Sequence, residues 1–360
     1  MTSILLITAI VLLSEHPGWS VEVVWETHGP ETRYGVTALT LDPGNPHLLF
    51  AGSDLGGLFK STDGGASWHT VWAPAPDGSV SNHVSDIRID PHHPEIVFVA
   101  VDSYVGSWQP GGVYRSDDGG VTWEPANDGL PGSAVSFLTV DPQESGVLYV
   151  GVSGQLFQSL DYGVTWQSSL SGEGIGVLAI DPQDSQILYA GGGGLYRSLD
   201  RGHSWIPSSQ GLLLDEVYIS SLAIAPTQAQ ILYAGGTPRG GPDFPGRIFK
   251  SVDGGMNWKE IAQLGTWLRT LVIDPAQTDM LYAGSSGKGG EIGTFVSSDG
   301  GNHWQRIHGG GAHELVIDPQ NAGVVYAGMR TSARGVFRFT IEDRTVIEGT
   351  TWGLIKALFR

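Results

Sequence analysis

The 360-residue sequence has no cysteine and few basic residues. Without cysteine it can form no disulfide and offers no thiol nucleophile, although a domain of this size needs no disulfide for stability, so the cellular compartment stays open. Only 19 residues are Lys or Arg, against 37 Asp or Glu, which gives a formal net charge of −18. Because such a surface repels a phosphate backbone, nucleic acid is not an expected partner.

Long hydrophobic segments are also missing. The largely apolar run at 4–13 is ten residues long, whereas a membrane-spanning helix needs about 20. Its length suits the core of a secretory signal peptide, with cleavage near Gly18 or Ser20 and a mature chain starting at Val21. No Lys or Arg precedes the run, and the alternative is a buried extra strand. We expect residues 1–20 to direct export, so that the protein is secreted or otherwise extracytoplasmic, with no integral membrane span after cleavage.

Several catalytic motifs are absent from the sequence. There is no His-Glu-x-x-His motif for a metal and no glycine-rich phosphate loop before a helix. The pair His92 and His93 lies in an Asp-Pro turn, and His308 and His313 flank three glycines. Paired histidines in turns are more typical of solvated loops than of metal sites, so we expect no cofactor and no metal.

Glycine is abundant, with 53 residues, and it recurs periodically, which argues against disorder. One motif, Ser-x-Asp-x-Gly-x-x-Trp, which we call the turn phrase, occurs six times, at 61–68, 116–123, 159–166, 198–205, 251–258 and 297–304. Its Asp can accept hydrogen bonds from the amides of a tight turn, and its Gly can supply a positive φ. The Trp then opens the next strand. The phrase therefore predicts a β-turn between two strands.

A second repeat alternates with the first. Seven apolar segments run through an Asp-Pro or Ala-Pro turn into a second apolar strand, at 38–52, 86–100, 137–151, 177–191, 222–235, 271–284 and 315–328. The segments recur about every 40 to 50 residues, which with four strands per unit is typical of β-propeller blades.

The two repeats differ in number, and the difference predicts how the ring closes. The last unit, 312–340, has no turn phrase and no fourth strand, whereas 21–27 precedes the first unit and carries Trp25 where a fourth strand has its Trp. We therefore predict one all-β domain over 21–340, a seven-bladed β-propeller of four-stranded blades. The expected blades are 36–72, 84–126, 134–169, 175–208, 219–262, 268–308, and 312–340 completed by 21–27.

The C-terminal tail, 341–360, departs from the repeats. Leu354, Ile355, Leu358 and Phe359 have helical spacing, which predicts a short helix capped by Thr350 or Thr351. Such a helix would pack on its own domain or engage a partner.

The turn phrases resemble the Asp-boxes, or BNR repeats, of sialidases, sortilin-type receptors, a photosystem II assembly factor and xyloglucan-cleaving glycosidases. The coupling of an Asp-Pro strand pair to GLFKSTDGGASW at 57–68 is most similar to single-propeller relatives of the last group and to sortilin-type propellers. The resemblance covers 21–340 and implies the fold more than a function. Sialidases have six blades and an arginine triad, which this sequence does not match.

The Asp-boxes themselves are expected to be structural because they repeat six times. A calcium loop would need oxygen ligands spread over about a dozen residues. Function is expected on the opposite face, where the loops at 100–112, 235–247, 284–293 and 329–335 diverge. These loops carry Asp102, Tyr104, Trp108, Arg239, Asp243, Lys288, Glu291, Arg330 and Arg334. Of these, Tyr104, Trp108, Arg239, Asp243, Arg330 and Arg334 are the candidate ligand-binding residues.

Two functions follow from this arrangement. The resemblance to xyloglucan-cleaving enzymes implies that Asp54 is a catalytic carboxylate, and glycoside hydrolysis needs a second one, for which Asp102 and Glu291 are candidates. Those relatives carry their second acid on a second propeller, and Asp54 could equally cap its own loop. We therefore expect an exported, non-catalytic module that binds a glycan or protein partner. The alternative is a glycoside hydrolase acting on β-glucan or xyloglucan.

Overall fold

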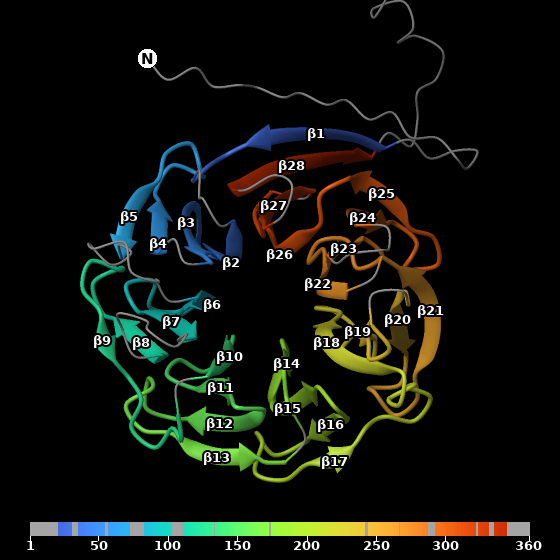
Figure 1. Cartoon of the computed structure of the whole chain (residues 1–360), viewed down its shortest axis with the longest axis horizontal. Helices are drawn as coiled ribbons and strands as arrows, with labels where there is room; N and C mark the ends of the chain where they lie inside the picture. Colours follow the sequence, from blue (N-terminus) through green and yellow to red (C-terminus); the bar gives the residue numbers. More distant parts are fainter. Residues whose placement is uncertain are drawn as a thin grey trace, which may run out of the picture.

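The computed structural model describes residues 21–343, except 31–34, 55–56, 73–82, 103–110, 133, 173, 242–243, 266, 287–291, 322 and 331–334. All regular elements in this part of the chain are strands. They form seven four-stranded antiparallel sheets arranged as blades around a central axis (Figure 1). The prediction of a seven-bladed β-propeller is confirmed. No helix in the described ranges is long and apolar enough to cross a bilayer.

Blades 1 to 6 each run outward in chain order from the innermost strand. Blade 1 contains β2 (Val36–Asp42), β3 (Asn45–Ser53), β4 (Gly57–Ser61) and β5 (His69–Trp72). Blade 2 contains β6 (His83–Ile89), β7 (Val97–Asp102), β8 (Gly112–Ser116) and β9 (Glu124–Pro125). Blade 3 contains β10 (Val135–Val140), β11 (Leu148–Val152), β12 (Gln155–Ser159) and β13 (Gln167–Leu170). Blade 4 contains β14 (Val177–Asp181), β15 (Asp184–Gly191), β16 (Leu195–Ser198) and β17 (Ile206–Pro207). Blade 5 contains β18 (Val217–Ile224), β19 (Leu232–Pro238), β20 (Gly246–Ser251) and β21 (Lys259–Leu264). Blade 6 contains β22 (Trp267–Ile273), β23 (Leu281–Ser286), β24 (Gly293–Ser297) and β25 (Gln305–His308).

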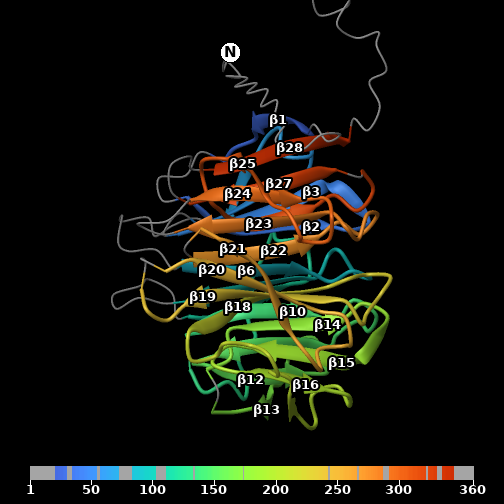
Figure 2. The same ribbon diagram turned by 90° about the vertical axis from the view of Figure 1, so that its right-hand side faces the viewer.

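Blade 7 closes the ring as the sequence predicts. It contains β26 (Ala312–Ile317), β27 (Val324–Met329) and β28 (Gly335–Asp343), and its outer strand is β1 (Val21–Thr27). Trp25 lies opposite Phe339 in the register. Figure 2 shows β1 and β28 side by side at the edge of the disc. The one difference is that β28 continues to Asp343, beyond the expected end of the propeller at residue 340, and the rest of the tail lies outside the described residues.

Each Asp-box turn is held by its own side chains. In blade 5, Ser251 Oγ accepts a hydrogen bond from the Gly255 amide at 2.9 Å and donates one to Asp253 Oδ1 at 2.8 Å. Asp253 Oδ1 also accepts the Asn257 amide at 2.9 Å. Gly255 has φ +80°, a left-handed conformation that favours glycine. The box is therefore a self-capped turn.

The Asp-boxes lie on the same face as the turns between the first two strands of each blade. The Gly119 amide donates to the Glu95 carbonyl at 2.8 Å, and the Gly254 amide donates to the Gln230 carbonyl at 2.9 Å. We call this side of the disc the Asp-box face. The other side, where the second strand of each blade ends, is the candidate face.

Neighbouring blades are joined on the Asp-box face by a repeated contact, which we call the seam hydrogen bond. A tyrosine hydroxyl on the second strand of one blade donates to the carbonyl of the fourth Asp-box residue of the next blade. The four pairs are Tyr149 with Arg201 (3.2 Å), Tyr189 with Gly254 (2.9 Å), Tyr233 with Gly300 (3.0 Å) and Tyr326 with Gly64 (3.2 Å).

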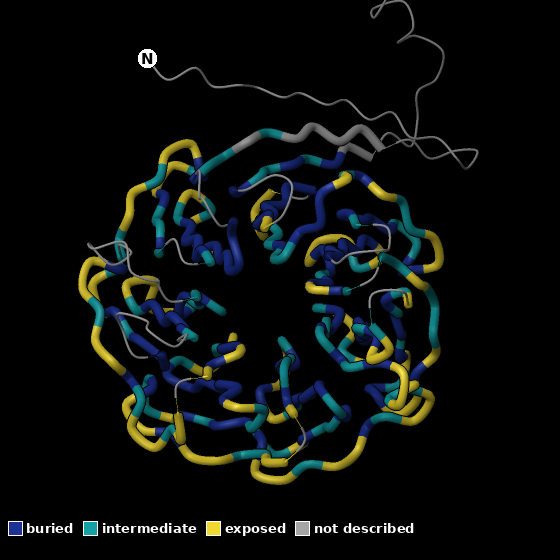
Figure 3. The backbone as a smooth tube through the Cα atoms, viewed as in Figure 1, coloured by how far each residue is buried: buried dark blue, intermediate teal, exposed yellow. Residues whose placement is uncertain are grey.

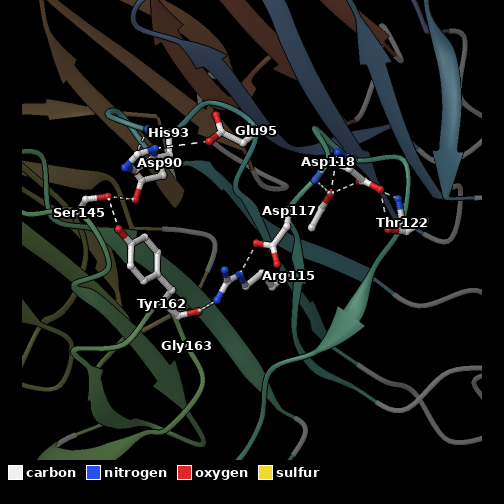
Figure 4. Close-up of polar contacts among 12 residues, drawn as sticks. Asp90, His93, Glu95, Arg115, Asp117, Asp118, Thr122, Ser145, Tyr162 and Gly163 are labelled. Carbon is white, nitrogen blue, oxygen red and sulfur yellow. Dashed lines mark hydrogen bonds and ion pairs between the residues drawn. The ribbon is translucent and has the colours of Figure 1, made fainter.

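Blades 2 and 3 are joined on this face by a different set of contacts (Figure 4). Arg115 donates to the Tyr162 carbonyl at 3.2 Å, and the Tyr162 hydroxyl donates to Ser145, which donates to Asp90 at 2.8 Å. Polar contacts on the Asp-box face thus hold neighbouring blades together.

The hydrophobic core lies between successive blades. One cluster, for example, joins Phe98 of blade 2 to Leu148 and Trp166 of blade 3, all of them buried. Figure 3 shows buried backbone through the middle of the blades and exposed backbone mainly at the outer turns. Each fully buried side chain of this size contributes about 1.5–3 kcal/mol, so contacts between blades stabilise the ring beneath the candidate face.

Candidate functional site

The sequence-predicted site residues fall into two groups. Asp54, Asp102, Arg239 and Arg330 are described, and all four follow or end the second strand of a blade. The remaining candidates lie outside the described residues: Tyr104, Trp108, Asp243, Lys288, Glu291 and Arg334.

Asp54 lies between a guanidinium and an imidazole on the candidate face. Its Oδ2 is 2.8 Å from Arg330 Nη2, and its Oδ1 is 3.3 Å from His83 Nδ1. The hydrogen bond from His83 and the charge of the two neighbours hold the pKa of Asp54 below its usual value, against the opposing effect of partial burial. Asp54 is therefore an ionised carboxylate at neutral pH.

Glycine at position 35 allows Arg330 to approach Asp54. Gly35 has φ +85°, and a Cβ on this residue would lie 2.6 Å from the Arg330 Cα. Its carbonyl accepts the Asp54 amide at 3.3 Å. The backbones of blades 7 and 1 thus meet directly beneath the ion pair.

The backbone register also places Asp102 near this cluster. Asp54 forms a β-bridge with His83, and His83 pairs with Asp102 in blade 2. Directly opposed residues point to the same side of a sheet. With strands about 4.5–5.5 Å apart, the Cα atoms of Asp54 and Asp102 are separated by roughly 10 Å, and His83 lies between them.

Arg269 and His313 form the inner part of the same cluster. Arg269 Nε donates to Ser286 Oγ at 3.0 Å, and its guanidinium carbon is 5.5 Å from the centre of the Trp267 ring. His313 Nδ1 lies 3.1 Å from the Thr37 carbonyl. Burial, together with the charge of Arg269, lowers the pKa of His313 to about 3. The imidazole is therefore neutral, with its Nδ1–H donated to blade 1.

Sequence reasoning missed these two residues, although a signal for them exists. When the innermost strands are aligned on their Asp-Pro or Ala-Pro turns, one position carries small or hydroxyl residues in five blades: Thr37, Ser85, Ser136, Gly176 and Ser220. Three of these hydroxyls donate to the next blade, as when Ser220 Oγ donates to the Leu268 carbonyl at 2.7 Å. Arg269 and His313 are the departures at this position.

Further toward the Asp-box face, Asp86 and Arg88 join blades 2 and 3. Asp86 Oδ2 accepts the Leu138 amide at 2.9 Å, and Arg88 Nε donates to the Leu138 carbonyl at 3.0 Å. Glu314 of blade 7 is near them, and burial raises its pKa to about 8, with the negative charge of Asp86 adding to the effect. Asp86 and Arg88 thus hold blades 2 and 3 together.

Arg239 is not part of the cluster around Asp54. It extends from blade 5, and it donates to the carbonyls of Leu214 (2.9 Å), Val217 (3.1 Å) and Gly193 (3.2 Å). Its guanidinium carbon lies 5.9 Å from the centre of the Tyr218 ring. The side chain thus connects blades 4 and 5.

The described residues contain no group of three or more His, Asp or Glu side chains arranged to hold a metal ion. The described side chains of the cluster are one ionised carboxylate, two guanidiniums and two imidazoles. Such a set can position a carboxylate, donate hydrogen bonds to ligand oxygens and attract an anion.

Residues 114–125 match the BNR/Asp-box repeat family. A xyloglucanase of Paenibacillus sp is 31% identical over 152 residues, which are 38% of this chain and 14% of that protein. A xyloglucanase of Hypocrea jecorina is 31% identical over 147 residues, which are 36% of this chain and 17% of that protein. Each match thus spans less than a fifth of the curated relative.

Solved structures share the fold. The GH74 xyloglucanase from Xanthomonas campestris superimposes with a TM-score of 0.69 at 22% identity, covering 87% of this chain and 53% of that one. YCF48 from Cyanidioschyzon merolae gives a TM-score of 0.60 at 14% identity, covering 88% and 98% of the two chains. The chain is therefore a seven-bladed β-propeller with an Asp-box repeat, similar in sequence to part of several xyloglucanases and in fold to GH74 propellers.

Proposed function

We propose that this protein is an exported, non-catalytic module that recognises a glycan or a protein partner through its candidate face. The observation that carries the proposal is the pairing of Asp54 with both His83 and Arg330. A carboxylate that is paired with an arginine and contacts an imidazole is a weakened nucleophile, and with a lowered pKa it cannot act as the acid that protonates a leaving group.

The position of the other described candidate acid also favours binding. Asp102 is separated from Asp54 by the intervening His83 strand. Hydrolysis requires two carboxyl groups about 5–9.5 Å apart on opposite sides of a scissile bond. Two acids in one row of a sheet instead suit a ligand that lies across the row. Tyr104, Trp108, Asp243 and Arg334, from the adjoining loops, are proposed to contribute further contacts.

Glycoside hydrolysis is the second candidate function. The ionised state of Asp54 is compatible with a base that activates water, and the partial similarity to xyloglucanases concerns proteins of that activity. In this case Glu291 or Asp102 would serve as the acid. The chain spans about half of the Xanthomonas xyloglucanase structure, so the activity of that whole protein is not transferred to it.

Calorimetric titration of the purified chain with xyloglucan and β-glucan oligosaccharides, together with an assay for new reducing ends, separates the two functions. The binding proposal expects heat of binding from a glycan ligand without turnover. Asp54→Asn and Asp102→Asn keep the size of each side chain and serve as matched variants. Turnover that is lost in Asp54→Asn would establish the hydrolase and overturn the non-catalytic proposal.

A further inference from the structure

Two sets of equivalent residues end at the candidate face close to the axis. The first set, which we call the inner ring, consists of one residue on or directly before each innermost strand: Thr37, Ser85, Ser136, Gly176, Ser220, Arg269 and His313. The second set, the outer ring, lies four positions after the buried aromatic residue of each second strand: Asp54, Asp102, Ser153, Gly193, Thr237, Ser286 and Arg330. In blades 1, 2, 3, 5, 6 and 7 the inner-ring residue falls at a β-bulge. Because bulges re-aim side chains and are common beside binding sites, the two rings together define an axial surface.

The axial surface differs in chemistry from one side to the other. In blades 3 to 5, both rings contain only glycine or hydroxyl residues: Ser136, Ser153, Gly176, Gly193, Ser220 and Thr237. Ser136 and Ser153 are exposed. In blades 6 and 7, the same positions carry Arg269 and Arg330, which are also exposed. Small polar side chains on one side thus face two guanidiniums on the other.

Arg269 presents hydrogen-bond donors that the protein does not use. Its Nε donates to Ser286 Oγ at 3.0 Å, and its guanidinium carbon lies 5.5 Å from the centre of the Trp267 ring. Within the described ranges it forms no ion pair, and its two Nη atoms have no acceptor. The guanidinium is therefore held in place with its outer donors available to an oxyanion, which it can bind through two parallel hydrogen bonds.

The backbones of blades 6 and 7 bring Arg330 close to Arg269. The innermost strands β22, β26 and β2 follow one another around the axis (Figure 1). The Gly311 backbone, directly before β26, lies so close to the Ser285 carbonyl that a Cβ would not fit. Ser285 precedes Ser286, which holds Arg269. The two arginines thus extend from adjoining segments of neighbouring blades.

The two guanidiniums repel each other. Desolvation, and then the charge of Arg330, lowers the pKa of Arg269. Nearby acids do not cancel both charges. Asp54 pairs with Arg330 Nη2 alone, and burial raises the pKa of Glu314 to about 8, so that its side chain is mostly uncharged at pH 7. With His313 neutral as well, one positive charge in excess remains, and a singly charged anion between the arginines would balance it.

We propose that Arg269 and Arg330 bind the acidic group of a glycan, a singly charged oxyanion that is either a uronate carboxylate or a sulfate ester. This inference rests on the proposed binding function and names its ligand class. The sugar chain extends over blades 3 to 5, where the hydroxyls of Ser136, Ser153 and Thr237 exchange hydrogen bonds with sugar hydroxyls. A protein partner fits less well, because protein interfaces centre on apolar and aromatic anchors and neither ring contains an apolar side chain.

The charge of the whole protein limits how many acidic groups this glycan carries. The formal net charge is −18, so a densely charged polymer is repelled at long range. Asp54 and Asp102 occupy the outer ring in blades 1 and 2, which disfavours a second acidic group on that side. The site therefore suits a glycan with isolated acidic groups, in contrast to a neutral glucan.

Three monosaccharides that differ only at C6 test this assignment: glucuronate, glucose 6-sulfate and glucose. Binding to the full-length protein is measured by ligand-observed NMR at low salt. We expect both acids, or one of them, to bind about tenfold or more tightly than glucose, as for a charge-assisted hydrogen bond, and the tighter acid identifies the natural group. Arg269→Gln should abolish this preference. Arg306→Gln should keep it, because Arg306 lies on β25, the outermost strand of the same blade.

Melting curves of both variants check that each one folds, and a second readout needs no variant. Raising the salt concentration should weaken binding of the acids and leave glucose unaffected. The assignment is overturned if the acids bind no better than glucose, or if their advantage survives Arg269→Gln. Neutral gluco-oligosaccharides that still bind in that case would leave the proposed binding function intact. Arg269-dependent binding of a peptide with a free C-terminal carboxylate, without binding of either acidic sugar, would also overturn the assignment in favour of a protein partner.

Discussion

Arg330 Nη2 lies 2.8 Å from Asp54 Oδ2, and this ion pair joins blade 7 to blade 1 across 276 positions of sequence. A second contact at the same junction is His313 Nδ1 with the Thr37 carbonyl at 3.1 Å. The ring is therefore closed twice, by β1 at its outer edge and by these polar contacts near its axis. The residue that the sequence singles out for chemistry is also part of the closure.

Asp54→Asn should destabilise the protein in a pH-dependent way. The pKa of Asp54 is lowered in the folded state, first by the hydrogen bond from His83. Its stabilisation is therefore present above the unfolded pKa, near 4, and is lost as pH falls through the folded value. We expect a loss of about 0.5–1.5 kcal/mol at pH 7, because the pair is partly exposed, and almost none at pH 2.5. Urea unfolding at both pH values measures this. An equal loss at both would mean that the charge of Asp54 is not stabilising.

Glu314→Gln should stabilise the protein at high pH, whereas Asp54→Asn should destabilise it. The folded pKa of Glu314, about 8, is raised above its ordinary value of 4.5. The folded protein therefore holds a proton that the unfolded chain releases, and stability declines as pH rises from about 4.5 to 8. Glutamine removes this loss, so the variant should match the parent near pH 4.5 and exceed it by roughly 1–3 kcal/mol at pH 8.5. The difference is measured by denaturant unfolding across this range. A variant that is less stable than the parent at pH 8.5 contradicts the raised pKa of Glu314.

The Asp-box carboxylates should govern unfolding in acid. Hydrogen bonds from Asn257, first its side chain and then its amide, lower the pKa of Asp253 to about 2, and those from Ser67 do the same for Asp63. Stability from these groups is present above about pH 4 and is lost as pH falls toward 2. Asp253→Ala should lower Tm by about 1–3 °C at pH 7 and make no difference near pH 2. Asp128→Ala, at an exposed position, is the control and should have little effect at either pH.

The fold could be predicted because the sequence repeats the motifs that specify each blade. Six Asp-boxes and seven strand-turn-strand segments each specify one local structure, and their unequal numbers identify β1 as the closing strand. The extension of β28 to Asp343 could not be predicted in this way. It occurs where the repeat is broken, so no other blade offers a template.

The candidate site was only partly accessible to the same reasoning. The resemblance singles out Asp54, but the partners of this residue lie 29 positions away, at His83, and 276 positions away, at Arg330. A period of 40 to 50 residues predicts which strands are neighbours and says nothing about which side chains meet at the axis. Arg239 shows the opposite case. Its charge and its place in a divergent loop suggest a ligand contact, whereas its guanidinium donates to backbone carbonyls.

Two glycines in the linker between blades 2 and 3 offer a sharp test of the packing between blades. Gly129 has φ +93°, and a Cβ there would lie 2.2 Å from the Trp166 carbonyl oxygen. Gly132, three residues later, has an ordinary φ and open space around it. Gly129→Ala should therefore cost at least about 2 kcal/mol, from the left-handed backbone together with the clash. Gly132→Ala should be neutral or should stabilise by up to about 1 kcal/mol, because it restricts the unfolded chain.

Chemical unfolding of both glycine variants beside the parent measures these costs. The contact matters because the Trp166 amide donates to the Asp128 carbonyl at 2.8 Å, and Trp166 Nε1 donates to the Ala126 carbonyl at 2.9 Å. The linker is thus fixed against the Trp of the next Asp-box, and only glycine permits the approach at residue 129. If both variants lost the same stability, the linker would be loosely packed, and the rigid coupling of blades 2 and 3 inferred from these contacts would be wrong.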